Sequence, residues 1–218
     1  MRTSSAVLIW SALAGWGGLS AKAVEAQVRA DAGASARARA DSVRYPYYGA
    51  DIRFMGGMIA HHAQALVMAG LAPSREAGDP ILRLCERIIN AQQDEIRLMQ
   101  VWLADRGQPV PEPHLTATGV MMHGATSDTL MPGMLTEAQM RDLRQARGRE
   151  FDRLFLTYMI QHHRGAVSMV ENLFASQGAG RDLTVFKLAS DISVDQATEI
   201  RRMQQMLAGI LLPERTQP

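Results

Sequence analysis

The residues of this sequence best suited to chemistry are two pairs of adjacent histidines, His61-His62 and His162-His163. The first pair lies in the stretch DIRFMGGMIAHHAQALVMA and the second in DRLFLTYMIQHHRGAVSMV. Aligned on the histidines, the two stretches also share an Asp, a Phe, a Met-Ile pair, an Ala and a final Met. Imidazole nitrogens and thioether sulfurs bind soft transition metals. An internal repeat that keeps these side chains predicts a metal-binding site more readily than a repeated packing pattern.

Two glutamates strengthen this prediction. Glu95 and Glu199 each follow a Gln by three residues and precede a Met by four, so the repeat continues beyond the histidines. Helical spacing places both carboxylates on otherwise apolar stripes, where a charge is costly unless it is paired or bound to a metal. The alternative is a structural network in which the glutamates accept hydrogen bonds from the histidines. The duplication favours metal binding, and whether the glutamates act as ligands stays open.

Four helices are expected to position these side chains. They span about residues 51–71, 80–104, 136–176, with a break at Gly148, and 182–211. Pro80 suits a first helical position, and Thr136 is a typical N-cap. No segment shows the alternation of a strand. Two short links and one long one predict an all-α, ferritin-like four-helix bundle made of two helical hairpins and a crossover.

The crossover contains a second group of soft donors. Its methionines and histidine lie in a stretch rich in Gly, Ser, Thr and Pro, namely Met121, Met122, His123, Met131 and Met134. Thioethers prefer Cu(I) or Ag(I) to harder ions. This segment therefore predicts capture of a soft ion, unless it folds back and its methionines cap the bundle.

The N-terminus predicts export. A positive start, an apolar run and an Ala-Lys-Ala sequence make residues 1–23 a signal peptide cleaved after Ala23, with an uncleaved membrane anchor as the alternative. Residues 24–46 lack large apolar side chains and are expected to form a flexible lead-in. The bundle then comprises repeat one (47–105), the crossover (106–135) and repeat two (136–212). A periplasmic or secreted protein is expected.

Charge and cysteine content exclude several classes of function. Cleavage of residues 1–23 removes two basic residues and changes the formal net charge from +1 to −1, which gives no electrostatic basis for binding nucleic acid. No other stretch is apolar enough to insert stably in a membrane. Cys85 is the single cysteine, so it forms no internal disulfide and is expected to be a small buried hydrophobe rather than a ligand.

The pattern D-x-x-F-x-x-x-M-I-x-H-H-x-x-A, with the run GREFDRLF in the second copy, resembles the ferritin-like "domain of unknown function" family 305. That family includes periplasmic copper- and silver-binding proteins linked to copper resistance. The resemblance extends over about residues 47–212. It implies a helical bundle that binds copper, or silver, through the residues matching the motif, namely Met58, His61, His62, Met159, His162 and His163.

Two function classes follow. The first is an extracytoplasmic protein that takes part in copper sequestration, transfer or resistance. The second is a ferritin-like redox enzyme with a paired-metal site. Such enzymes use Glu-x-x-His motifs, which this sequence lacks, so the enzyme ranks second and no catalytic residue is assigned. A bundle without any ligand is the remaining alternative. Metal ions are the expected partners, while a homo-oligomer and a metal-transport or chaperone partner stay open.

Overall fold

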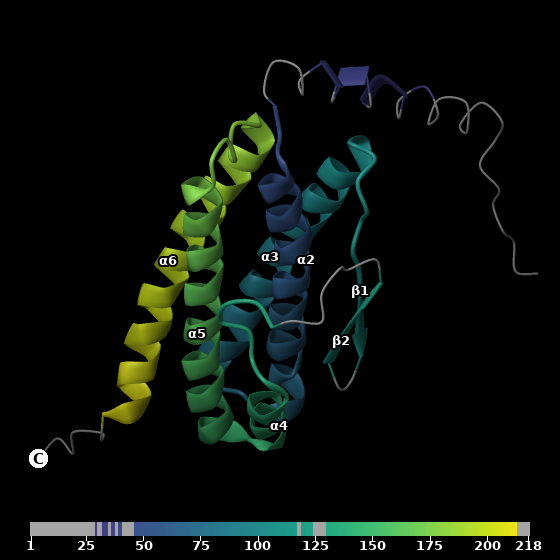
Figure 1. The fold of residues 1–218 in the computed structure, drawn as a ribbon. Coiled ribbons are helices and arrows are strands. Elements are labelled where there is room, and N and C mark those ends of the chain that lie inside the picture. Colours follow the sequence, from purple (N-terminus) through teal and green to yellow (C-terminus); the bar gives the residue numbers. More distant parts are fainter. Residues whose placement is uncertain are drawn as a thin grey trace, which may run out of the picture.

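The computed structural model describes residues 46–116, 119–123 and 130–212, together with residues 29, 32–34, 36, 37, 39 and 40, which are helical. The predicted signal peptide and most of the predicted lead-in lie outside the described residues. Figure 1 shows the arrangement of the described elements, with the long helices side by side.

The long helices are α2 (Gly49–Gly70), α3 (Asp79–Asp105), α5 (Gly148–Ala175) and α6 (Leu183–Leu211). Helix α2 packs along α3, α5 packs along α6, and the two hairpins meet through α2 and α5 (Figure 1). A short 3-10 helix (Ala72–Arg75) follows α2, and α4 (Glu137–Gln145) precedes α5. The predicted helical fold class is confirmed, and the helices form two hairpins joined by a long crossover.

Local sequence signals explain where the helices begin. Thr136 caps α4: its hydroxyl accepts the Gln139 N–H, and the Gln139 side chain accepts the Thr136 N–H in return. The Asp182 carboxylate accepts two N–H groups at the start of α6. The break expected at Gly148 is present, because the chain leaves α4 after Gln145 and Gly148 has a positive φ of 52°.

The crossover differs from the prediction. Instead of lacking strands, it holds an antiparallel hairpin of β1 (Glu112–Thr116) and β2 (Gly119–His123) that contacts α2 (Figure 1). In register, Leu115 lies opposite Val120. Five-residue strands carry too little alternation to be recognised, and their pairing depends on the partner strand and on the helix beneath them.

A buried polar layer divides the core. One apolar cluster surrounds Phe155 and Met159, and another surrounds Met58 and Trp102. Between the two lie the repeated histidines and two repeated glutamines, all buried, with the repeated glutamates at the margin. Buried polar groups cost stability unless they are satisfied, so this layer is the part of the fold that requires a functional explanation.

Candidate metal centre

All four histidines of the repeat lie together between α2 and α5, and none is exposed. The rings of His61 and His162 are closest, with centroids 3.8 Å apart and planes inclined by 39°. Within each pair the centroids are 6.3 Å apart. The chain thus brings residues from two repeats into one cluster, with His61 and His162 at its centre and one histidine on each flank.

Each flanking histidine faces a repeated glutamate. His62 Nε2 lies 2.7 Å from a Glu95 carboxylate oxygen on α3, and His163 Nε2 lies 2.7 Å from a Glu199 oxygen on α6. Both carboxylates keep some solvent exposure, 15% for Glu95 and 22% for Glu199. A carboxylate on one ring nitrogen is the usual partner of a metal-binding histidine, because it orients the ring and raises its basicity.

Several ring nitrogens have no hydrogen-bond partner in the described part of the chain. They are His61 Nδ1, both nitrogens of His62, both nitrogens of His162 and His163 Nδ1. His62 Nε2 lies 2.7 Å from Glu95 but without hydrogen-bond geometry. The amide of Gln92 and the amide oxygen of Gln196, also buried, are likewise unpartnered there. An unsatisfied buried polar atom costs about 1–3 kcal/mol, so an ion that accepted these lone pairs would recover part of that free energy. The donor set fits a metal that prefers imidazole.

Burial keeps the two central histidines neutral. Desolvation lowers the pKa of His61 from 6.5 to about 3, with the neighbouring His62 acting in the same direction. Desolvation also lowers the pKa of His162 well below its ordinary value, and the other three histidines add to the effect. The backbone carbonyl of Pro132 partly opposes the shift of the His61 pKa. Neutral imidazole is the form that binds metal.

The methionines of the repeat flank this layer. Met58 and Met159 are fully buried one turn before the histidines, and they belong to the two different apolar clusters. Their burial among apolar side chains fits core packing, and one turn of helix separates each thioether from its histidine pair.

The side chains of two crossover methionines, Met131 and Met134, lie in the described part of the crossover. Met131 Sδ is 3.1 Å from the position that a Cβ on Gly57 would occupy, so its side chain sits where α2 lacks one. The Met131 N–H points to Met134 Sδ at 3.4 Å. Both side chains are half-buried on the bundle. The side chains of Met121, Met122 and His123 lie outside the described residues.

In the described part of the chain, no group of three or more His, Cys, Asp or Glu side chains has an arrangement ready to hold an ion. The reason is visible in the contacts: the Nε2 atoms of His62 and His163 face carboxylates, and that of His61 lies 3.0 Å from the Pro132 carbonyl oxygen. Binding an ion through these atoms would require the rings to turn away from their present partners.

Residues 51–207 match the sequence model of the family described as "Domain of unknown function (DUF305)". The chain belongs to the DUF305 family. It is similar to solved DUF305 structures described as a candidate secreted protein from Streptomyces coelicolor (27% identity, TM-score 0.63, covering 77% of this chain and 98% of that one) and a fragment from Deinococcus radiodurans (31%, 0.61, 75% and 98%).

The chain is also similar to a protein whose structure was solved with bound metal. CopM in its Cu(I)-bound form is 27% identical, with a TM-score of 0.56, and the match covers 74% of this chain and 98% of that one. CopM also matches in its Cu(II)-bound and silver-bound forms. A comparison with curated proteins gives no match. In the described part of this DUF305 chain, no helix meets the length and hydropathy that a membrane span needs.

The repeated aspartates of the DUF305 domain join the hairpins at their ends. Asp51 Oδ1 accepts the N–H of Gly180, in the loop between α5 and α6, at 2.7 Å. Asp152 accepts the N–H of Gly78, in the loop between α2 and α3, at 3.2 Å. Each aspartate therefore holds the loop of the other hairpin, which explains why the repeat contains it without giving it a place in the metal centre.

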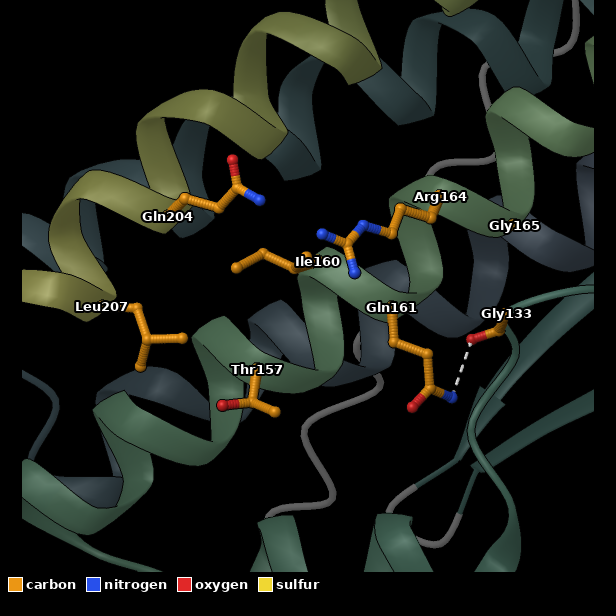
Figure 2. A pocket seen from close by; sticks show the side chains of 8 residues that line it. All are labelled: Gly133, Thr157, Ile160, Gln161, Arg164, Gly165, Gln204 and Leu207. Atoms are coloured by element: carbon orange, nitrogen blue, oxygen red, sulfur yellow. Dashed lines mark hydrogen bonds between the residues drawn. The ribbon is translucent and has the colours of Figure 1, made fainter. Parts of the chain in front are cut away.

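An open groove of about 630 Å³ lies between α5 and α6 (Figure 2). Its lining combines apolar and polar side chains and contains no histidine: Gly133, Thr157, Ile160, Gln161, Arg164, Gly165, Gln204 and Leu207. Gly133 and Gly165 belong to the contact between the crossover and α5, so that contact forms one edge of the groove. The groove is consequently a separate surface feature of the DUF305 domain.

Cys85 is buried in the apolar cluster that contains Leu84 and Ile88. Burial raises the pKa of its thiol to about 12. A protonated thiol is a poor metal ligand, so the structure supports the expected packing role.

Proposed function

We propose that this DUF305 protein binds copper or silver ions outside the cytoplasm and serves in their sequestration, transfer or resistance. One observation carries the proposal: two repeats bring four fully buried histidines together, and six of their ring nitrogens have no hydrogen-bond partner in the described part of the chain. The similarity to CopM in its Cu(I)-, Cu(II)- and silver-bound forms supports the choice of metal.

The proposed central donors are the imidazoles of both histidine pairs, with Met58 and Met159 as thioether ligands. Imidazole suits copper in both oxidation states, whereas added thioethers shift preference to Cu(I) and Ag(I). Glu95 and Glu199 would orient His62 and His163 and neutralise part of the charge of a bound cation. The ion is cargo here, held by the chain and released from it.

The proposed second set of donors is the crossover group of Met121, Met122, His123, Met131 and Met134. Support comes from the half-buried Met131 and Met134, which rest against the bundle on the segment that also contacts His61. A soft ion held there would lie on the same side of the bundle as the central site. The opposing hypothesis is that Met131 only fills the space left by Gly57.

We place the protein in the periplasm or outside the cell, after removal of residues 1–23 as a signal peptide. The relative from Streptomyces coelicolor is described as a candidate secreted protein, which supports this location. Exposure to extracytoplasmic copper would then be direct.

A paired-metal redox enzyme remains the second candidate. In that class, carboxylates from several helices converge on two ions. Here Glu95 on α3 faces His62, and Glu199 on α6 faces His163, so the two carboxylates face different histidines. The sequence also contains no Glu-x-x-His. The geometry therefore favours binding over catalysis.

The deciding experiment measures metal content and binding. Protein purified from its native compartment is analysed for metals, and metal-free protein is titrated with Cu(I), Cu(II) and Ag(I) against chelators of known affinity. The double variant His62→Ala/His163→Ala should lose high-affinity copper and keep its helicity. The matched control is His114→Ala, which changes an exposed histidine of β1. Unchanged copper binding in the double variant would make the histidine layer structural.

A further inference from the structure

The crossover forms a hydrogen bond with only one of the two central histidines. His61 Nε2 lies 3.0 Å from the carbonyl oxygen of Pro132. A carbonyl only accepts, so this nitrogen carries the proton and Nδ1 carries the lone pair. In His162, the corresponding residue of the second repeat, neither ring nitrogen has a hydrogen-bond partner in the described residues. The tautomer is therefore set by a hydrogen bond in His61 and not in His162, although the two motifs match.

The side chain of Gln64 holds the crossover in place. Gln64 lies on α2, three residues after His61, and is 8% exposed. Its Oε1 accepts the Leu135 N–H at 2.6 Å, and its Nε2 donates to the Leu135 carbonyl at 3.1 Å. One amide thus satisfies both backbone groups of a buried residue that lies three positions after Pro132. Fixing Leu135 against α2 fixes Pro132 near His61.

Gly165 provides the space on the other side. It occupies the position in the second repeat that corresponds to Gln64 in the first. A Cβ on Gly165 would lie 1.9 Å from the Pro132 carbonyl oxygen, so the crossover rests directly on the backbone of α5. Gly133, with a φ of 77°, completes the contact, and its carbonyl accepts from Gln161 Nε2 at 3.3 Å (Figure 2).

We propose that Gln64 and Gly165 are positioning residues of the metal centre, which seat Pro132 so that its carbonyl fixes His61 with the proton on Nε2 and the lone pair on Nδ1. The inference rests on the proposed function and adds an asymmetry to it: the side of the layer under the crossover has a set tautomer, and the His162 side does not. Partners of this kind determine which nitrogen a histidine offers, and their loss typically weakens metal binding by about 10–100-fold.

The first measurement needs no metal. Nitrogen-15 NMR of the histidine rings in the metal-free chain at pH 7.5 reports which nitrogen is protonated. We expect the Nε2–H tautomer for His61 in the unaltered protein and a mixture in both Gln64→Met and Gly165→Ala. The controls are Gln205→Met and Gly209→Ala, which change exposed positions of α6, the second with open space for a Cβ. They should retain the original His61 signals.

The second measurement is competitive Cu(I) titration of the same proteins. Both positioning variants should bind about 10–100-fold more weakly, and both controls should match the unaltered protein. The inference is wrong if His61 carries its proton on Nδ1, if both variants keep the Nε2–H tautomer, or if the tautomer changes without a change in affinity. Should Gly165→Ala not fold, Gln64→Met decides alone. An unaltered protein that binds no copper but shows the expected tautomers would overturn the proposed function and leave the positioning of His61 intact.

Discussion

The ring centroids of His61 and His162 lie 3.8 Å apart, with the ring planes inclined by 39°, although each residue comes from a different repeat. Both are fully buried, and burial lowers the pKa of each. Without an ion, the fold therefore keeps two neutral, incompletely bonded imidazoles in its interior. Under the proposed function, the same imidazoles that destabilise the metal-free fold would stabilise it when they bind an ion.

Metal-free stability should depend on pH through His61. The folded chain takes up the His61 proton only near pH 3, whereas the unfolded chain does so near its ordinary value of 6.5. Below pH 6.5 the unfolded state thus binds more protons, so the free energy of unfolding should be level above 6.5 and fall as the pH drops toward 3. His162 contributes with the same sign.

Urea unfolding of chelator-treated protein at pH 7.5, 6 and 5 measures this dependence. The fall is expected to reach at most about 1.4 kcal/mol per pH unit for each depressed histidine. The variant His61→Phe should give a shallower slope. A free energy of unfolding that is constant from pH 7.5 to 5 would contradict the assigned burial.

Replacing a central histidine by an apolar ring should stabilise the metal-free fold. In His162→Phe, two buried and unpartnered nitrogens are exchanged for carbon in a ring of similar shape. We expect the free energy of unfolding to rise by about 1–3 kcal/mol and the stabilisation by added Cu(I) to disappear. Thermal unfolding with and without Cu(I) checks both effects, and a destabilised variant that still responds to copper would refute the prediction.

The glutamates should tune affinity rather than create the site. Glu199→Gln keeps size and hydrogen-bonding capacity but removes the charge opposite His163. Affinity for Cu(I) is expected to fall by about 10–100-fold with the number of bound ions unchanged, and Glu95→Gln should behave alike. Loss of one ion per chain in either variant would instead make that carboxylate a direct ligand. Glu171→Gln, at an exposed position of α5, is the control.

Asp51 is expected to contribute to the free energy of unfolding and not to copper binding. Its carboxylate accepts the N–H groups of Gly180 and Tyr48, both at 2.7 Å, and it is fully buried. Asp51→Ala leaves both donors without their acceptor, at an expected cost of about 2–5 kcal/mol. Urea unfolding measures the loss. Copper stoichiometry at low temperature, where the variant stays folded, should equal that of the unaltered chain, and a reduced stoichiometry would place Asp51 in the metal centre.

The proposed role of the crossover methionines as ligands can be tested by measuring Cu(I) binding at acidic pH. Thioethers carry no titratable proton, so ions bound by Met121, Met122, Met131 and Met134 should persist at a pH that empties histidine sites. Replacing all four by Leu preserves volume and apolarity, and should lower the number of Cu(I) ions held at acidic pH with little change in metal-free melting temperature. Unchanged stoichiometry with a clear drop in melting temperature would show that these methionines only pack on the bundle.

The sequence by itself determined the helices and the repeat. Helical periodicity, the Thr136 cap and the break at Gly148 are local signals, since they depend on residues within one or two turns of each other. The duplicated histidines also predicted the position of the candidate site. Two matching helical hairpins that pack against each other bring the matching residues of both repeats together. The family resemblance agreed with the family that the comparison shows.

Tertiary structure alone decided the environment of those histidines. The pairing of His62 with Glu95, the ring contact of His61 with His162 and the contact of His61 with Pro132 all join distant parts of the chain. The one sequence signal for the crossover contact was that the aligned repeats differ at Gln64 and Gly165. The structure explains this difference, because Gln64 binds Leu135 of the crossover and Gly165 makes room for Pro132. Hydrogen bonds, burial and the resulting pKa depend on three-dimensional neighbours, and spacing along a helix fixes only the face on which a side chain lies.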